Sequence, residues 1–187
     1  MHTRWQRPGR GPAFLVRPLR HGDVRTVMGV FKRLGEQSRR TRFNGPKPCL
    51  RFSELRQLAT VDATHHALVA YVEGDPQPAA IARLVRDGRS AEVAFAVADE
   101  YQRRGIGSAL TAELLADARA AGITEITALV SSDNSAAVAL LRRVLRSLDI
   151  RHEGPELMIR ARASEARRPA LRHLNALMHL NATERPR

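Results

Sequence analysis

Residues 91–110, AEVAFAVADEYQRRGIGSAL, place a strand, a glycine-rich turn and the start of a helix in direct succession. The strand, residues 91–98, is predicted from alternation that gives it two different faces. One face carries residues suited to a core: Ala91, Val93, Phe95 and Val97. The other face carries Glu92 and then only alanines, at positions 94, 96 and 98. Such small side chains leave room for a ligand beside the strand.

The turn after this strand reads Gln102-Arg103-Arg104-Gly105-Ile106-Gly107-Ser108. A long amphipathic helix, residues 107–121, is predicted behind it, with Gly122 as its stop. The first amides of a helix lack acceptors and lie at the positive end of its dipole, and glycines let an anion approach them. The turn therefore predicts a diphosphate site with arginines at its rim, and an ordinary glycine-rich turn is the alternative.

Two common nucleotide motifs do not fit this turn. The three-glycine spacing of the Rossmann fingerprint is missing, and no acidic residue follows at the required strand end. The Lys-Ser/Thr pair that closes a Walker loop is absent as well. A diphosphate other than that of a dinucleotide or of ATP is indicated.

Strand and helix patterns alternate along the rest of the chain, which predicts an α/β (α+β) fold with a mixed sheet. Helices are expected after the cap Asp23, near residues 53–58 and after Asp133-Asn134-Ser135. Further strands are expected at residues 14–19, 66–73, 79–86, 123–130, 149–152 and 157–161. The folded domain should span residues 13–162. Residues 1–12 are expected to form a disordered basic tail, and residues 163–187 a basic tail with one possible helix.

The net charge of +12 over 187 residues is concentrated at the two ends. Residues 1–20 contain five arginines and no acid, and residues 160–187 contain seven arginines and two glutamates. Residues 21–159 hold 19 basic and 17 acidic side chains, which is typical of a globular enzyme and not of a duplex-binding surface. Nucleic acid is therefore expected to bind through the basic tails only, if it binds.

The composition also excludes several classes of protein. No run approaches the roughly 18 to 20 apolar residues of a membrane helix, and no apolar segment of a secretory leader follows the first residues. The lone Cys49 cannot form an internal disulfide, so a cytoplasmic location is expected. Zinc held by thiolates is excluded, and no metal is predicted.

The segment Gln102-Arg103-Arg104-Gly105-Ile106-Gly107 matches in full the motif Q/R-x-x-G-x-G/A and thereby resembles the GNAT family of acyl-CoA-dependent N-acyltransferases. The order of elements over about residues 14–162 is similar as well. The resemblance implies a sheet of six to seven strands with about four flanking helices, and acetyl-CoA as the acyl donor.

The resemblance also implies that the turn holds the coenzyme A pyrophosphate and that the strand before it pairs with pantetheine. Asn134 matches a residue near the pantetheine arm, and a helix cap is its alternative role. The implied coenzyme-binding residues are Phe95, Ala96, Val97, Gln102, Arg103, Arg104, Gly105, Ile106, Gly107, Ser108 and Asn134.

Glu92 is the candidate catalytic residue. An alkyl ammonium of pKa about 10.4 is less than roughly one part per thousand free amine at neutral pH, so its acylation benefits from a base. Glu92 resembles the general base of the family's protein lysine acetyltransferases, and an exposed strand glutamate is the alternative.

The general acid is in doubt. Leu141 stands where many members have a tyrosine, and Tyr71 and Tyr101 are no clear substitutes. A thiol of pKa about 8.5 leaves readily without a dedicated acid, and an amide near Phe95 or Ala96 could stabilise the oxyanion.

Three segments, with sequences SRRTRF, HHALVAYVEG and AEVAFAVADEYQRRGIG, are similar to bacterial protein lysine acetyltransferases of the Pat type. Arg39, Arg40 and Arg42 could then meet an acidic protein surface or a small acidic amine, or be surface arginines. The expected partners are acetyl-CoA and an amine acceptor, in a monomer or homodimer without membrane contact. An acyl-CoA-binding regulator without turnover and a small-molecule amine acetyltransferase are the alternative functions.

Overall fold

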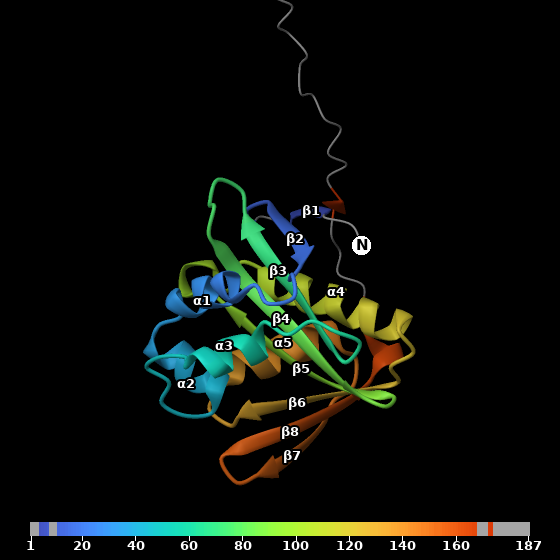
Figure 1. The fold of residues 1–187 in the computed structure, drawn as a ribbon. Coiled ribbons are helices and arrows are strands. Elements are labelled where there is room, and N and C mark those ends of the chain that lie inside the picture. Colours follow the sequence, from blue (N-terminus) through green and yellow to red (C-terminus); the bar gives the residue numbers. More distant parts are fainter. Residues whose placement is uncertain (1–3, 8–10, 168–171, 174–187) are drawn as a thin grey trace, which may run out of the picture.

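A computed structural model describes residues 4–7, 11–167 and 172–173. Its centre is one mixed sheet, in which nine strands lie in the order β7-β8-β6-β5-β4-β3-β2-β1-β9 (Figure 1). The strands are β1 (Arg4–Arg7), β2 (Phe14–Pro18), β3 (His65–Val72), β4 (Pro78–Asp87), β5 (Ser90–Val97), β6 (Glu125–Ser131), β7 (Asp149–Glu153), β8 (Glu156–Arg162) and β9 (Arg172–His173). Among the described strands only β5 and β6 pair in parallel.

Five α-helices are present in the described residues. They are α1 (Val24–Lys32), α2 (Glu36–Phe43), α3 (Phe52–Leu58), α4 (Ile106–Ala120) and α5 (Ser135–Val144). Two short 3-10 helices, η1 (Asp99–Tyr101) and η2 (Ala163–Glu165), complete the described elements. Helix α4 is the crossover that a parallel strand pair requires, since it joins β5 to β6.

Local sequence sets the ends of these helices. Asp23 caps α1, because its Oδ1 accepts a hydrogen bond from the Thr26 amide at 3.0 Å. Asn134 caps α5 in the same way, with the Ala137 amide 3.0 Å from its Oδ1. Gly122, just beyond α4, has a φ of +82°, which a side chain would strain.

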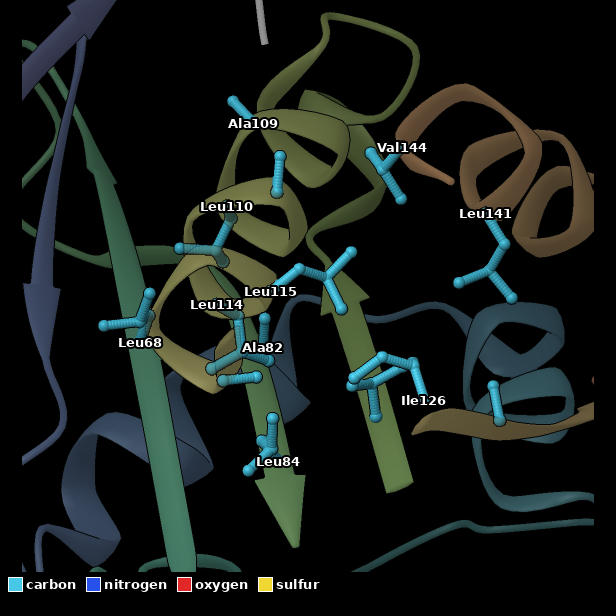
Figure 2. Close-up of a cluster of buried hydrophobic side chains, with 14 of the residues drawn as sticks. Leu68, Ala82, Leu84, Ala109, Leu110, Leu114, Leu115, Ile126, Leu141 and Val144 are labelled. Atoms are coloured by element: carbon cyan, nitrogen blue, oxygen red, sulfur yellow. The ribbon is translucent and has the colours of Figure 1, made fainter. Parts of the chain in front are cut away.

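Helices cover both faces of the sheet (Figure 1). Helices α4 and α5 pack on one face, and α1 and α3 pack over the other around a smaller core. Figure 2 shows Leu110 and Leu114 of α4 beside Leu68 and Ala82 of the sheet. Alternate residues of each central strand reach opposite cores, so Leu68 belongs to the larger core and Val69 to the smaller.

The fold class and the order of elements are confirmed. The described sheet has nine strands, more than the six to seven expected, because β1 and β9 extend it beyond β2; the seven strands β2 to β8 lie within residues 13–162. The structure differs at the amino-terminal tail, where Arg4–Arg7 form β1 instead of remaining disordered. β1 pairs with the edge of β2, and the Gln6 side chain is fully buried with its Nε2 donating to Glu113 Oε2 at 2.6 Å. The Arg-, Gly- and Pro-rich composition indicated disorder there, because composition does not show that β2 has an open edge with which these residues can pair. The helix suggested after Pro169 lies outside the described residues apart from β9.

The fifth helix, α2, was not predicted. Its sequence, EQSRRTRF, has no apolar periodicity, and none of its residues is fully buried. The helix ends at Asn44, which has a left-handed conformation with φ of 53°.

No helix among the described residues is long and apolar enough to cross a membrane. Cytoplasmic location stays a prediction from the sequence.

The larger core predicts a clear stability contrast between two leucines. Leu114, a residue of α4, is completely buried in the larger core, whereas Leu129 on β6 is 37% exposed. We expect Leu114→Ala to lower the free energy of unfolding by about 2–5 kcal/mol, because it leaves a cavity. The matched change Leu129→Ala should cost about 0.5 kcal/mol. Urea unfolding followed by circular dichroism measures both, and equal losses would contradict this packing.

Candidate active site

The sheet opens between its two parallel strands. β6 pairs with β5 only where Glu125 to Thr127 lie beside Ser90 to Glu92. Beyond Glu92, β5 continues beside β4 alone, as far as Val97. One edge of the carboxyl-terminal half of β5 is thus without a neighbouring strand in the described part of the chain.

The register shows which backbone groups face this opening. The Ala98 amide donates to the Ala79 carbonyl at 2.8 Å, so the hydrogen-bonded pairs of this antiparallel ladder involve the even-numbered residues of β5. The amides and carbonyls of Phe95 and Val97 consequently point away from β4, toward the opening. The Ala96 amide points to β4, which favours Phe95 over Ala96 as a donor to a bound ligand.

Gln102 ties the glycine-rich turn to the end of β5. Its Nε2 lies 3.1 Å from the Val97 carbonyl oxygen, 3.0 Å from Asp99 Oδ1 and 3.0 Å from Ser38 Oγ. The side chain therefore saturates the last carbonyl of the strand and also reaches α2. The Val97 amide and both backbone groups of Phe95 have no partner among the described residues.

The turn itself presents a run of unpaired amides. Arg103 and Gly105 have left-handed backbones, with φ of 59° and 84°, and Gly105 is the residue before α4. Among the described residues the backbone N–H groups of residues 103–108 have no acceptor, whereas the Ala109 amide bonds to the Gly105 carbonyl at 3.0 Å. A run of amides at a helix amino-terminus is an anion-binding arrangement. The side chains of Arg103 and Arg104 are exposed beside it.

Gly107 brings α4 close to both neighbours. The residue is buried, and a Cβ there would lie 3.0 Å from Leu140 on α5 and 3.0 Å from Val97 on β5. Absence of a side chain thus keeps the start of α4 against the end of the strand. Ile106 is fully buried and Ser108 half-buried in the same turn.

The small-residue face of β5 lines a cleft, as predicted. Ala94 and Ala96 lie in a hollow of about 410 Å³, part of it open to solvent, between the sheet and the first three helices. Most of its wall is apolar, and two arginines, Arg42 of α2 and Arg83 of β4, also line it. Glu92 lies two residues before Ala94 on the same face, and its side chain is exposed.

Both arginines of the cleft are electrostatically perturbed. Burial lowers the pKa of Arg42, Arg83 lowers it further, and the charge of Glu92 raises it. Burial likewise lowers the pKa of Arg83, and Asp62 raises it. The pKa of Arg42 therefore responds to the charges of both Arg83 and Glu92. Arg83 was not singled out by the sequence analysis.

Leu141 is fully buried in the larger core, so this position offers no proton donor. The two tyrosines are held by other groups. The Tyr101 hydroxyl donates to Asp75 Oδ2 at 2.8 Å, and the Tyr71 hydroxyl accepts from Arg17 Nη2 at 2.6 Å. A tyrosine acid at the site therefore has no support in the described residues.

His66 of β3 is only 6% exposed. Its Nε2 lies 2.9 Å from Asp117 Oδ2 of α4, on the side of the sheet opposite the cleft. It thus joins β3 to α4. Asn134 acts as the cap of α5, and its Nδ2 has no hydrogen-bond partner among the described residues.

A network of charges holds η1 and with it the entrance to the turn. Arg33 Nη2 lies 2.6 Å from Asp75 Oδ2 and 2.5 Å from Glu100 Oε1. Partial burial works to lower the pKa of Arg33, but the hydrogen bonds to the carboxylates outweigh it and raise that pKa. The hydrogen bond from Arg33, followed by that from the Gln77 amide, holds the pKa of Asp75 below its usual value. Burial and the bond to Asp75 raise the pKa of Tyr101.

Among the described residues no three histidine, cysteine, aspartate or glutamate side chains are grouped so as to hold a metal ion.

The open strand edge, the amide-lined turn and the small-residue cleft thus lie together at the carboxyl end of β5. The chain belongs to the Acetyltransferase (GNAT) family, whose family model matches residues 34–145.

Known proteins are similar to this chain in sequence and in structure. The chain is 35% identical over 138 residues to acetyltransferase Pat of Mycolicibacterium smegmatis (strain ATCC 700084 / mc(2)155), which covers 72% of this chain and 41% of that relative. It thus spans less than half of the relative's length.

The crystal structure of the GNAT domain of S. lividans PAT matches with a TM-score of 0.72 at 24% identity, over 80% of this chain and 90% of that one. The PaiA N-acetyltransferase of Thermoplasma acidophilum, in complex with coenzyme A, matches with a TM-score of 0.61 at 16% identity, over 80% and 98% of the two chains. At these identities the two structures show the fold alone.

The Asp75 network predicts acid-sensitive stability. Because the folded-state pKa of Asp75 lies below its unfolded value of about 3.9, its contribution is present above about pH 4 and is lost as the pH falls through the lowered pKa. We expect Asp75→Asn to lower the free energy of unfolding at pH 7, with a smaller deficit at pH 3. Urea unfolding at both values measures this.

The control is Asp87→Asn, since Asp87 is exposed and has no side-chain hydrogen bond in the described structure. Its difference from the wild type should not change with pH. A deficit for Asp75→Asn that is the same at pH 7 and pH 3 would contradict the assigned network.

Proposed function

We propose that this protein transfers an acetyl group from acetyl-CoA to a primary amine. The observation that carries the proposal is the run of unpaired amides at residues 103–108, placed directly beside the open edge of β5. An anion at the amides and an extended amide-containing arm along the edge are the two features of coenzyme A that this geometry suits. The PaiA N-acetyltransferase, which has a similar fold, was solved in complex with coenzyme A, and this supports the same class of ligand here.

The proposed donor contacts follow from the backbone. The amides of residues 103–108 would hold the pyrophosphate, with Arg103 and Arg104 adding charge from the exposed rim. Phe95 and Val97 would pair with the pantetheine arm through the groups that face the opening, with Ala96 between them. Asn134 Nδ2, which the helix cap leaves without a partner, would donate to the same arm. Gln102 would act indirectly, by fixing the turn to the strand end.

Glu92 is the proposed general base. It lies on the strand face that lines the cleft, at the position where β5 and β6 begin to separate. In the proposed step the amine nitrogen forms a bond to the thioester carbonyl carbon, and the carbon–sulfur bond breaks. Before the attack the ammonium gives one proton to the Glu92 carboxylate, directly or through water. The nitrogen of the tetrahedral intermediate loses its second proton to solvent, and the departing thiolate takes a proton from solvent. The Phe95 amide would donate to the oxyanion.

Protein lysine is the acceptor that the resemblance to Pat-type enzymes implies. The competing function is acyl-CoA binding without turnover, which the buried Leu141 favours because no hydroxyl acid replaces it. Thiol release measured over a panel of amines and proteins separates the two functions.

Glu92→Gln tests the base. We expect turnover to fall by roughly 100-fold or more, with the affinity for acetyl-CoA unchanged, because proton removal is lost and the donor contacts are not. Thiol release at neutral pH and calorimetric titration with acetyl-CoA measure the two quantities. Glu73→Gln, at an exposed glutamate in the turn between β3 and β4, is the matched control and should retain full turnover. Normal turnover of Glu92→Gln would remove the assignment.

Ser108→Asp tests the diphosphate site. A carboxylate in the first turn of α4 interacts favourably with the helix dipole, so the fold should keep its melting temperature. The same charge repels a pyrophosphate, and we expect acetyl-CoA to bind at least about tenfold more weakly. Ser108→Asn, of similar size and neutral, is the control. Calorimetry on the three proteins measures the affinities, and unchanged affinity of Ser108→Asp would place the diphosphate elsewhere.

A further inference from the structure

The cleft beside β5 holds two cationic groups in an apolar wall. Arg42 and Arg83 are both half-buried there, among side chains such as Phe31, Leu58 and Ile81. A charge taken out of water is costly unless a partner compensates it. The partners of the two guanidinium groups therefore indicate what the cleft is built to receive.

Arg83 is partly compensated by the chain itself. Its Nη1 donates to the carbonyls of Leu58 and Thr60, the latter at 3.3 Å. The remaining N–H groups of its guanidinium have no hydrogen-bond partner within the described residues. These contacts anchor the side chain at the end of α3. They leave the other edge of its guanidinium available to a ligand.

Arg42 has less compensation. Its guanidinium lies 5.1 Å from the ring centroid of Phe43, and it forms no side-chain hydrogen bond or ion pair within the described residues. Its nearest charged influences are the like charge of Arg83 and the opposite charge of Glu92. Two guanidinium groups that repel each other inside a cleft are an arrangement that an anion stabilises.

The position of the pair relative to Glu92 gives the anion a chemical identity. Arg83 lies opposite Ala94 on the neighbouring strand, and Glu92 lies two residues before Ala94 on the same face. Arg42 reaches this face from α2, which contacts both β5 and β6. A molecule with its amine at Glu92 would therefore have the arginines within reach of a second, negatively charged group.

We propose that the acceptor amine carries a carboxylate and that Arg42 and Arg83 bind this carboxylate while Glu92 receives the amine. The inference rests on the proposed acetyl transfer and specifies its acceptor class. Arginine binds carboxylates with paired, charge-assisted hydrogen bonds, which fixes orientation as well as affinity. Polyamines and other purely cationic acceptors are disfavoured, since they would bring further positive charge to the two guanidinium groups.

One carboxylate chemistry has two sources. The group could belong to a free ω-amino acid, or to an acidic side chain next to a lysine on a protein. The experiment therefore uses two arms. The first contains glycine, β-alanine, 4-aminobutyrate and 6-aminohexanoate, each paired with its primary amide. The second pairs the peptides acetyl-Ala-Asp-Lys-Ala-amide and acetyl-Ala-Asn-Lys-Ala-amide.

Thiol release is measured with acetyl-CoA and each acceptor, and acceptor binding to the coenzyme A complex is measured by calorimetry. We expect at least one carboxylate acceptor to exceed its neutral partner by roughly 10- to 100-fold in kcat/KM or in affinity, the range for hydrogen bonds to charged groups. Preference within the first arm assigns a free amino acid, and preference within the second a protein lysine. Equal values for every pair in both measurements would overturn the proposal.

Arg42→Gln is the main variant, because Arg42 has no hydrogen bonds in the described structure whose loss would unfold the chain. We expect it to abolish the carboxylate preference, chiefly through KM, while acetyl-CoA binding stays normal. Arg56→Gln, at an exposed arginine of α3, removes the same charge outside the cleft and should keep the preference. Retention of the preference in Arg42→Gln would overturn the assignment. Failure of acetyl-CoA to bind the wild type would instead refute the proposed function.

Discussion

The pairing between β5 and β6 lasts for three residues, and the site depends on its ending there. If β5 and β6 paired along their whole length, the backbone N–H and C=O groups of Phe95 and Val97 would be hydrogen-bonded to β6. No backbone group of β5 would then be available to a ligand. Because the strands separate after Glu92, the edge of β5 stays open. The amides of the following turn are unpaired because they precede the first hydrogen bond of α4. The open strand edge therefore leads directly to the anion-binding turn.

The two faces of the sheet then have different tasks. On the side of α4 and α5 the packing is continuous, and Gly107 lets the start of α4 sit against Val97 without an intervening side chain. This packing holds the turn against the end of β5. On the side of α1 to α3 the core is smaller, and the alanines of β5 leave a hollow lined by two arginines. The face with the larger core thus supports the proposed donor site, and the face with the smaller core contains the proposed acceptor cleft.

Much of this could be predicted from local sequence. The alternation in residues 91–98 separated a core face from the face that lines the cleft, and the caps Asp23 and Asn134 marked helix starts that the structure confirms. These features depend on neighbouring residues along the chain. Their physical cause is therefore visible in a short window.

Features that depend on distant partners were missed. β1 forms because β2 offers an open edge, and α2 forms although its own sequence has no apolar stripe. His66 is buried because Asp117 of α4 meets it across the core. One sequence signal could have identified Arg83, because an arginine in an otherwise apolar strand requires a polar partner. Its partners, the carbonyls of Leu58 and Thr60, lie at the end of α3 and just after it, and the strand pattern does not reveal them.

Short links join α2 to the turn. Ser38 of α2 accepts from Gln102, and the Gly35 amide just before α2 donates to Asp99 Oδ2 at 3.0 Å. A side chain on Gly35 would come within 2.5 Å of that same oxygen, so this junction is tight. A movement of the turn would therefore reach α2, the helix that places Arg42 in the wall of the cleft.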